Sequence, residues 1–136
     1  MLERAAALAQ RAVSFAFETT LASRSLMRTI GEWRDQFGYR LHIVFLWLPG
    51  PEAAIARVRA RVALGGHGVP AASITRRYWR GLSNFLVLYQ KLATTWRVYD
   101  NSGRRPRLVA VGGPGQPARV RDPAAWMHIV ELAKHA

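Results

Sequence analysis

The chain has 136 residues and no cysteine, and its 20 lysine and arginine residues against 8 acidic residues give a formal net charge of +12. This length suits a single domain over residues 1–136, and the lack of cysteine excludes disulfides and thiolate metal sites. The longest apolar run, residues 43–49, is far too short for a membrane span, and the amphipathic amino terminus is unlike a signal peptide. We therefore expect a cytoplasmic protein without membrane contact.

The first half of the chain predicts alternating helices and strands. Residues 1–12 carry small apolar side chains at helical spacing. The apolar run 13–17 fits a buried strand. A helix over residues 24–36 follows, with Ser23 as its N-cap and Gly38 at its end. Residues 39–48 are β-branched and aromatic with an almost continuous apolar centre, which predicts a strand covered on both faces.

The second half continues the alternation. Helices are predicted over 51–64 and 71–93, on either side of the glycine-rich turn 65–70. Strands follow at 96–99 and 107–111, and Asp122 can cap a final helix over 123–135. The order of elements predicts an α/β fold with a mostly parallel sheet flanked by helices. In such sheets ligands bind outside the carboxyl ends of the strands.

Polar residues follow two of the predicted strands. Glu18, Thr19 and Thr20 follow the run 13–17, and a carboxylate there can order a magnesium ion through water or orient a substrate hydroxyl. The alternative is that Glu18 caps the next helix. Asp100 and Asn101 begin a turn over residues 100–103 that turn chemistry explains fully; a position of Asn101 near a nucleotide base is the second interpretation.

Arginines bracket the glycine-rich turn at helical spacing, so that two arginine-bearing helices joined by a glycine hinge could form a lid over a transferring phosphate. The alternative is a solvated basic face. The arginines concerned are Arg57, Arg59, Arg61, Arg76, Arg77 and Arg80. His67, between glycines of the hinge, either touches phosphate or merely tolerates a left-handed backbone.

A phosphate-binding loop is missing from the sequence. The motif Gly-x-x-x-x-Gly-Lys-Ser/Thr needs a Gly-Lys pair, but Lys91 follows a glutamine and Lys134 follows an alanine. The glycine-rich stretch 112–115 has no lysine, and its proline lacks the backbone donor that a phosphate cradle needs. The chain alone therefore cannot form the usual phosphate-binding loop for a nucleotide.

Over about residues 1–112 the chain resembles the zeta-toxin-like P-loop kinases, which are often labelled predicted ABC-type ATPases. The matching motifs, in order, are Phe17-Glu18-Thr19-Thr20-Leu21-Ala22-Ser23-Arg24, Gly38-Tyr39, Phe45-Leu46-Trp47-Leu48, Arg57-Val58, Arg61-Val62, Gly65-Gly66-His67, Arg76-Arg77-Tyr78 and Tyr99-Asp100-Asn101-Ser102. The resemblance implies a P-loop kinase fold that uses ATP and magnesium to phosphorylate a small hydroxyl-bearing substrate, which is UDP-N-acetylglucosamine for the characterised toxins.

The resemblance also implies roles for individual residues. Glu18 matches the acidic position near substrate and magnesium, and Thr19, Thr20 and Arg24 fall on the adjoining substrate loop. The lid that meets the ATP phosphates corresponds to Arg61, Arg76 and Arg77. The nucleotide-binding assignments are completed by Arg57, His67, Arg80 and Asn101.

The departure from the family is large, because the resemblance puts the first strand, the Walker A loop, its helix and the catalytic aspartate before Met1. The missing strand would lie between residues 13–17 and 39–48. The slot could close by direct pairing of its neighbours, be filled by a completing segment or a homo-oligomer, or destabilise the fold. We expect very low kinase activity from the chain alone. The alternative is a non-catalytic module that binds nucleic acid through its basic surface.

Overall fold

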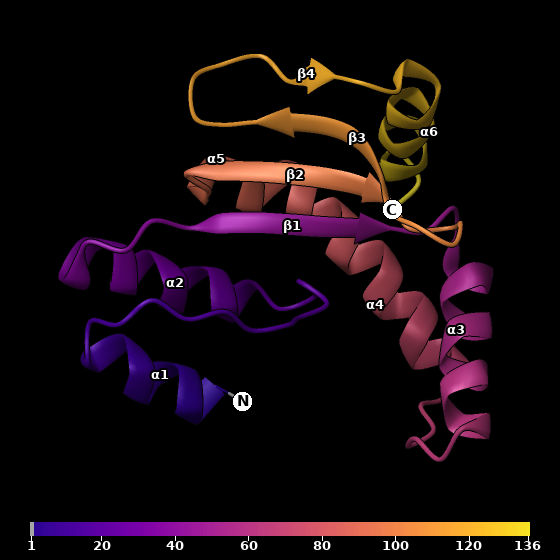
Figure 1. Cartoon of the computed structure of the whole chain (residues 1–136), viewed down its shortest axis with the longest axis horizontal. Helices are drawn as coiled ribbons and strands as arrows, with labels where there is room; N and C mark the ends of the chain where they lie inside the picture. The colour runs from indigo at the N-terminus through magenta and orange to yellow at the C-terminus, as the bar shows by residue number, and fades with distance from the viewer. Residues whose placement is uncertain (1) are drawn as a thin grey trace.

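The computed structural model describes residues 2–136 and has an α/β fold built on a four-stranded mixed sheet (Figure 1). The strands lie in the order β1 (His42–Trp47), β2 (Thr95–Asp100), β3 (Arg107–Gly112) and β4 (Arg119–Val120). β1 and β2 are parallel, whereas the β2–β3 and β3–β4 pairs are antiparallel. The α/β class is confirmed, but the prediction of a mostly parallel sheet is wrong. The connection of residues 101–106 is too short for a parallel crossover, so β3 returns beside β2.

The predicted helices are confirmed to within a few residues, apart from Met1, which lies outside the described residues. Ser23 Oγ accepts a hydrogen bond from the N–H of Leu26, Asp122 Oδ1 accepts one from Ala125, and Gly38 ends its helix at φ 70°. Within residues 2–136, each helix is too short or too polar to cross a bilayer. The helices are α1 (Leu2–Gln10), α2 (Arg24–Phe37), α3 (Pro51–Ala63), α4 (Ala71–Asn84), the π-helical segment η1 (Phe85–Tyr89), α5 (Gln90–Leu92) and α6 (Pro123–Ala133).

The core lies between one face of the sheet and the helices α4, η1 and α6. The Phe45 ring stacks on Phe85 with centroids 4.5 Å apart, and Trp96 stacks on Trp126 at 5.7 Å. Helix α2 joins the same core through Leu26, which is almost fully buried. The Phe45–Phe85 contact anchors the carboxyl end of α4, the helix that carries half of the predicted lid, because η1 follows α4 directly.

The predicted strand over residues 13–17 does not form. The segment runs without a strand partner, and its side chains pack sideways instead: the Phe15 ring meets Trp33 at 5.8 Å and Tyr39 at 5.7 Å. Tyr39 Oη donates to the Val13 carbonyl at 2.8 Å. The run is apolar enough for a strand, but a strand also needs a neighbour to satisfy its backbone groups. The slot expected between residues 13–17 and 39–48 is therefore not closed by direct pairing of 13–17 with β1.

The expected burial of 39–48 on both faces is also wrong. β1 is an edge strand of the sheet, and alternate side chains, Val44 and Leu46, are 60% and 52% exposed.

Candidate functional site

The parallel strands β1 and β2 end side by side, with Trp47 opposite Asp100. The N–H of Asn101 donates to the Trp47 carbonyl at 2.8 Å, which joins the two strand ends. Just beyond them, Tyr78 Oη donates to the Leu48 carbonyl at 2.6 Å. This hydrogen bond fixes α4 against the end of β1. Burial raises the pKa of Tyr78, so its hydroxyl stays a donor at neutral pH.

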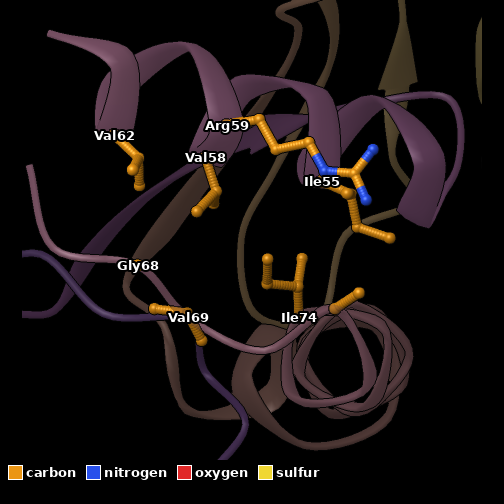
Figure 2. A pocket seen from close by; sticks show the side chains of 8 residues that line it. Ile55, Val58, Arg59, Val62, Gly68, Val69 and Ile74 are labelled. Atoms are coloured by element: carbon orange, nitrogen blue, oxygen red, sulfur yellow. The ribbon is translucent and has the colours of Figure 1, made fainter.

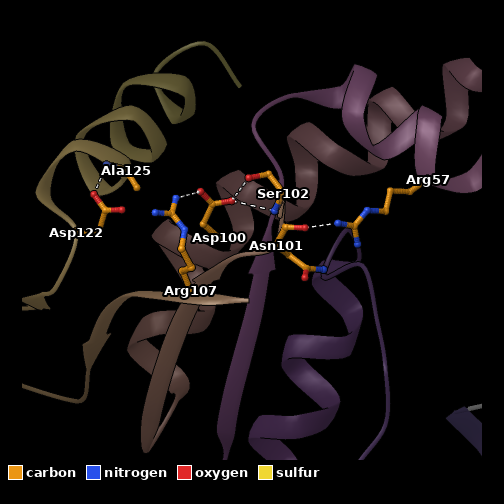
Figure 3. A network of polar contacts seen from close by, with 7 residues as sticks. All are labelled: Arg57, Asp100, Asn101, Ser102, Arg107, Asp122 and Ala125. Carbon is orange, nitrogen blue, oxygen red and sulfur yellow. Dashed lines mark hydrogen bonds and ion pairs between the residues drawn. The ribbon is translucent and has the colours of Figure 1, made fainter. Parts of the chain in front are cut away.

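The turn after β2 is locked by a buried carboxylate (Figure 3). Asp100 Oδ1 accepts from the Ser102 N–H at 3.0 Å and from the Ser102 hydroxyl at 2.6 Å, and Arg107 Nη2 donates to Oδ2 at 3.0 Å. Burial alone would raise the pKa of Asp100, but the hydrogen bonds from Ser102 and the charge of Arg107 outweigh it and lower the pKa below 3.8. The carboxylate is thus fully engaged in the turn, which confirms the turn interpretation of residues 100–103.

An arginine of α3 reaches this turn. The Arg57 guanidinium donates through Nη2 to the carbonyl of Asn101, so two residues assigned to nucleotide binding from the sequence lie in contact (Figure 3). The contact uses the backbone of Asn101. It ties the first turns of α3 to the carboxyl end of β2.

Residues 18–21 pack directly on α4, more than 60 positions later in the chain. Gly81 makes the approach possible: a Cβ atom there would lie 2.2 Å from the Thr20 carbonyl oxygen. Asn84, one turn further, is buried and donates through Nδ2 to the Leu21 carbonyl at 2.8 Å. The fold therefore holds the predicted substrate loop against the predicted lid helix.

The functional side chains of this loop remain outside the core. Glu18, Thr19 and Thr20 are all exposed, and the Thr19 hydroxyl accepts a hydrogen bond from the N–H of Leu21 at 3.2 Å. Leu21 itself is buried with φ 57°, a left-handed conformation that turns the chain toward α2. Arg24, the first residue of α2, is exposed just beyond this turn.

The predicted lid arginines all project from α3 and α4 with exposed side chains. Arg57 and Arg61 share a face of α3, Arg76 and Arg80 share a face of α4, and Arg77 lies one turn before Gly81. Across residues 2–136 the ion pairs are Arg34–Asp35, Arg107–Asp100 and Lys134–Glu131. The lid arginines thus carry charge that no carboxylate of the described chain neutralises.

A groove of about 280 Å³ separates α3 from the start of α4 (Figure 2). Ile55, Val58 and Val62 project into it from α3, and Val69 and Ile74 face them. Its basic lining residue is Arg59, which the site assignments from sequence left out; Arg57, Arg61 and the exposed His67 do not line it. The groove is therefore mainly apolar, with Arg59 in its lining and with Arg57 and Arg61 outside it.

Sequence reasoning gave no individual role to two residues of this region. Arg59 lies between Arg57 and Arg61 in a run of alternating arginines, and only the packing of α3 on α4 shows which of the three faces the groove. Tyr78 stands directly after the Arg76–Arg77 pair, and only its hydrogen bond to the Leu48 carbonyl shows that it reaches the end of β1.

The residues described do not assemble a metal site. Within residues 2–136, no group of three or more histidine, aspartate or glutamate side chains comes together. Glu18 is therefore not part of such a group.

No protein-family model matches the chain, and neither curated proteins nor solved structures give a significant match.

Proposed function

We propose that this chain supplies the acceptor loop and the arginine lid of a phosphoryl-transfer site, as in the zeta-toxin-like kinases that its sequence resembles. The observation that carries the proposal is the packing of residues 18–21 on Gly81 and Asn84 of α4. This contact brings a carboxylate and two hydroxyl residues to the helix that bears Arg76, Arg77 and Arg80. Such a pairing is what transfer of a phosphoryl group to a hydroxyl requires.

In the proposed site each part has a separate task. Glu18 orients or deprotonates the acceptor hydroxyl, with Thr19, Thr20 and Arg24 around the substrate. The guanidinium groups of Arg61, Arg76, Arg77 and Arg80 bind phosphate oxygens and stabilise the charge that develops on them. Arg57 and Asn101 hold the strand end beneath the nucleotide, and His67 belongs to the glycine-rich hinge between the two helices of the lid. The donor is ATP, and the acceptor is a small hydroxyl-bearing molecule.

By itself, the chain supplies only part of such a site. It has no Gly-Lys-Ser/Thr loop, so the main phosphate grip comes from outside these residues. No step is assigned to magnesium, because the described residues do not gather its ligands. The lid alone should bind ATP with a millimolar or weaker dissociation constant, equivalent to about −4 kcal/mol.

Nuclear magnetic resonance titration of the intact chain with ATP tests the proposal. We expect millimolar binding, with shift changes on α3 and α4, that weakens about tenfold in the double variant Arg76→Gln/Arg80→Gln. The matched control is Arg104→Gln/Arg105→Gln, which removes the same charge from the exposed β2–β3 turn. Submicromolar binding by the chain alone, or equal weakening in both double variants, would refute the proposed lid.

A second function, binding of nucleic acid, is favoured by the excess of exposed arginine over carboxylate. The basic residues lie on helices, strands and turns alike, and few are in ion pairs across residues 2–136. For this function we expect a single-stranded RNA 20-mer to bind with an affinity that falls steeply as salt rises. Both double variants would then weaken binding alike, because the contribution of each arginine depends on its charge rather than on its position.

A further inference from the structure

The sheet is covered on one face only. On β1, Phe45 and Trp47 point to the helices, where Phe45 stacks on Phe85 and Trp47 meets the His128 ring edge-on at 5.3 Å. On β2, Trp96 and Val98 are buried on the same side. Alternate residues of a strand point to opposite faces, so Val44, Leu46 and Arg97 belong to the other face. Figure 1 shows that face toward the viewer, with α4 passing behind the strands.

The strand register arranges the uncovered side chains in rows. Val44 lies opposite Arg97, which lies opposite Val111. Leu46 lies opposite Tyr99, which lies opposite Leu108. We call these six residues the open face. Apolar side chains thus occupy most of a sheet surface that water reaches.

Charge on the open face has one sign. Arg97 lies in the middle of the row Val44–Arg97–Val111, and Arg119 of β4 pairs with Val111 at the end of that row. Asp100 is the acidic residue of the four strands, and it is buried on the helix side in its contact with Arg107. Arg97 and Arg119 form no ion pair within residues 2–136.

We propose that the open face binds an amphipathic helix of a partner polypeptide, with leucine-like residues over Val44 and Leu46 and carboxylates opposite Arg97 and Arg119. A helix is the element that covers sheet faces in α/β folds, and β1 has the continuous apolar sequence of a strand covered on both sides. Unpaired arginines select an acidic helix.

A second copy of this chain is a poor occupant of the open face. It would bring another net charge of +12 and set arginine against arginine. The docking of an acidic helix is independent of the proposed kinase function, because no lid or acceptor residue lies on the open face.

Binding of designed helical peptides to the intact chain tests the inference. The probe is a capped peptide of about 20 residues, with leucine along one helical face and glutamate elsewhere. One comparison peptide has the same composition in scrambled order, and another has lysine in place of glutamate. We expect the leucine–glutamate peptide to bind at least about tenfold more tightly than either, which is about 1.4 kcal/mol, and to shift the backbone resonances of β1 and β2.

Substitutions locate the peptide on the open face. We expect Leu46→Asn and Arg97→Gln each to weaken binding at least about fivefold. Their matched controls are Met127→Asn, which changes an apolar residue 71% exposed on α6, and Arg104→Gln in the β2–β3 turn; neither should change binding by more than about twofold. Equal binding of the scrambled or lysine peptide would overturn the inference. So would a dimer in sedimentation that Leu46→Asn dissolves, because the occupant would then be a second copy.

Discussion

At the scale of single residues, the contact between Gly81 and Thr20 holds the proposed acceptor loop, residues 18–21, against α4. We expect Gly81→Ala to lower the free energy of unfolding by about 1–3 kcal/mol, because the added methyl group would meet the Thr20 carbonyl oxygen 2.2 Å away. Chemical denaturation measures this. The control is Gly31→Ala in α2, whose Cβ would lie 3.9 Å from Leu92 Cδ1. That change should stabilise the helix by up to about 1 kcal/mol. If both substitutions stabilise the chain, residues 18–21 do not pack as described.

Asp100 makes the stability of the chain depend on acid pH. Its pKa is lowered in the folded protein, so its contribution is complete above the ordinary value of 3.8 and is lost as pH falls through the lower folded value. We expect Asp100→Asn to cost on the order of 1.5 kcal/mol near neutral pH, and the difference from wild type to shrink below pH 3.8. Urea unfolding of both proteins at a series of pH values checks this; a difference that grows toward acid pH would contradict it.

The residues that sequence reasoning found are those whose role is local. Ser23, Gly38 and Asp122 act on backbone groups within four residues, so helix-capping rules identify them. Gly81 and Asn84 act on residues 20 and 21, and no local pattern indicates that contact. The motif Phe17-Glu18-Thr19-Thr20 indicated a functional loop, but its location against α4 required the fold.

At the scale of elements, the unpaired segment 13–20 should be the least protected part of the amino-terminal half. Within residues 2–136, none of its N–H groups donates to a backbone carbonyl, whereas β2 is hydrogen-bonded to strands on both sides. We expect the amides of β2 to exchange with deuterium at least about 100-fold more slowly than those of 13–20. Exchange followed by nuclear magnetic resonance measures both in one sample, and comparable protection would mean that 13–17 pairs as a strand.

Apart from the strand predicted over 13–17, element types followed from hydrophobic spacing, but strand pairing did not. Residues 13–17 and 39–48 have the apolar character of buried strands, yet burial needs neighbours that the pattern cannot supply. The antiparallel pairing of β3 with β2 could have been predicted from the sequence, because residues 101–106 are too few to form a parallel crossover. The long helix predicted over 71–93 is continuous in direction. Its π-helical segment at Phe85–Tyr89 brings Phe85 and Tyr89 fully into the core. Helical periodicity does not predict such a segment.

At the scale of the whole molecule, one imbalance underlies both proposals. Twenty basic residues face eight acidic ones, and the lid arginines and Arg97 of the open face are all without carboxylate partners in the described part of the chain. In the proposed phosphoryl-transfer site the lid directs this charge toward phosphate, whereas the open face combines it with exposed Val44 and Leu46. Charge alone therefore does not distinguish the lid from the open face. The exposed apolar side chains of the open face distinguish them.

The same imbalance predicts how salt affects stability. Like charges repel more strongly in the compact state than in the unfolded one, so screening should stabilise the fold. We expect the free energy of unfolding in urea to rise by on the order of 1 kcal/mol between about 20 mM and 300 mM sodium chloride. Arg76→Gln/Arg80→Gln and Arg104→Gln/Arg105→Gln should both reduce this rise, because each lowers the net charge by two. Sodium sulfate at equal ionic strength tests whether the lid binds anions. If it does, sulfate should stabilise the wild-type chain more than chloride does, and Arg76→Gln/Arg80→Gln should lose this additional stabilisation whereas Arg104→Gln/Arg105→Gln should keep it. A free energy that falls with added chloride would show that attraction, not repulsion, dominates among the charges of the folded chain.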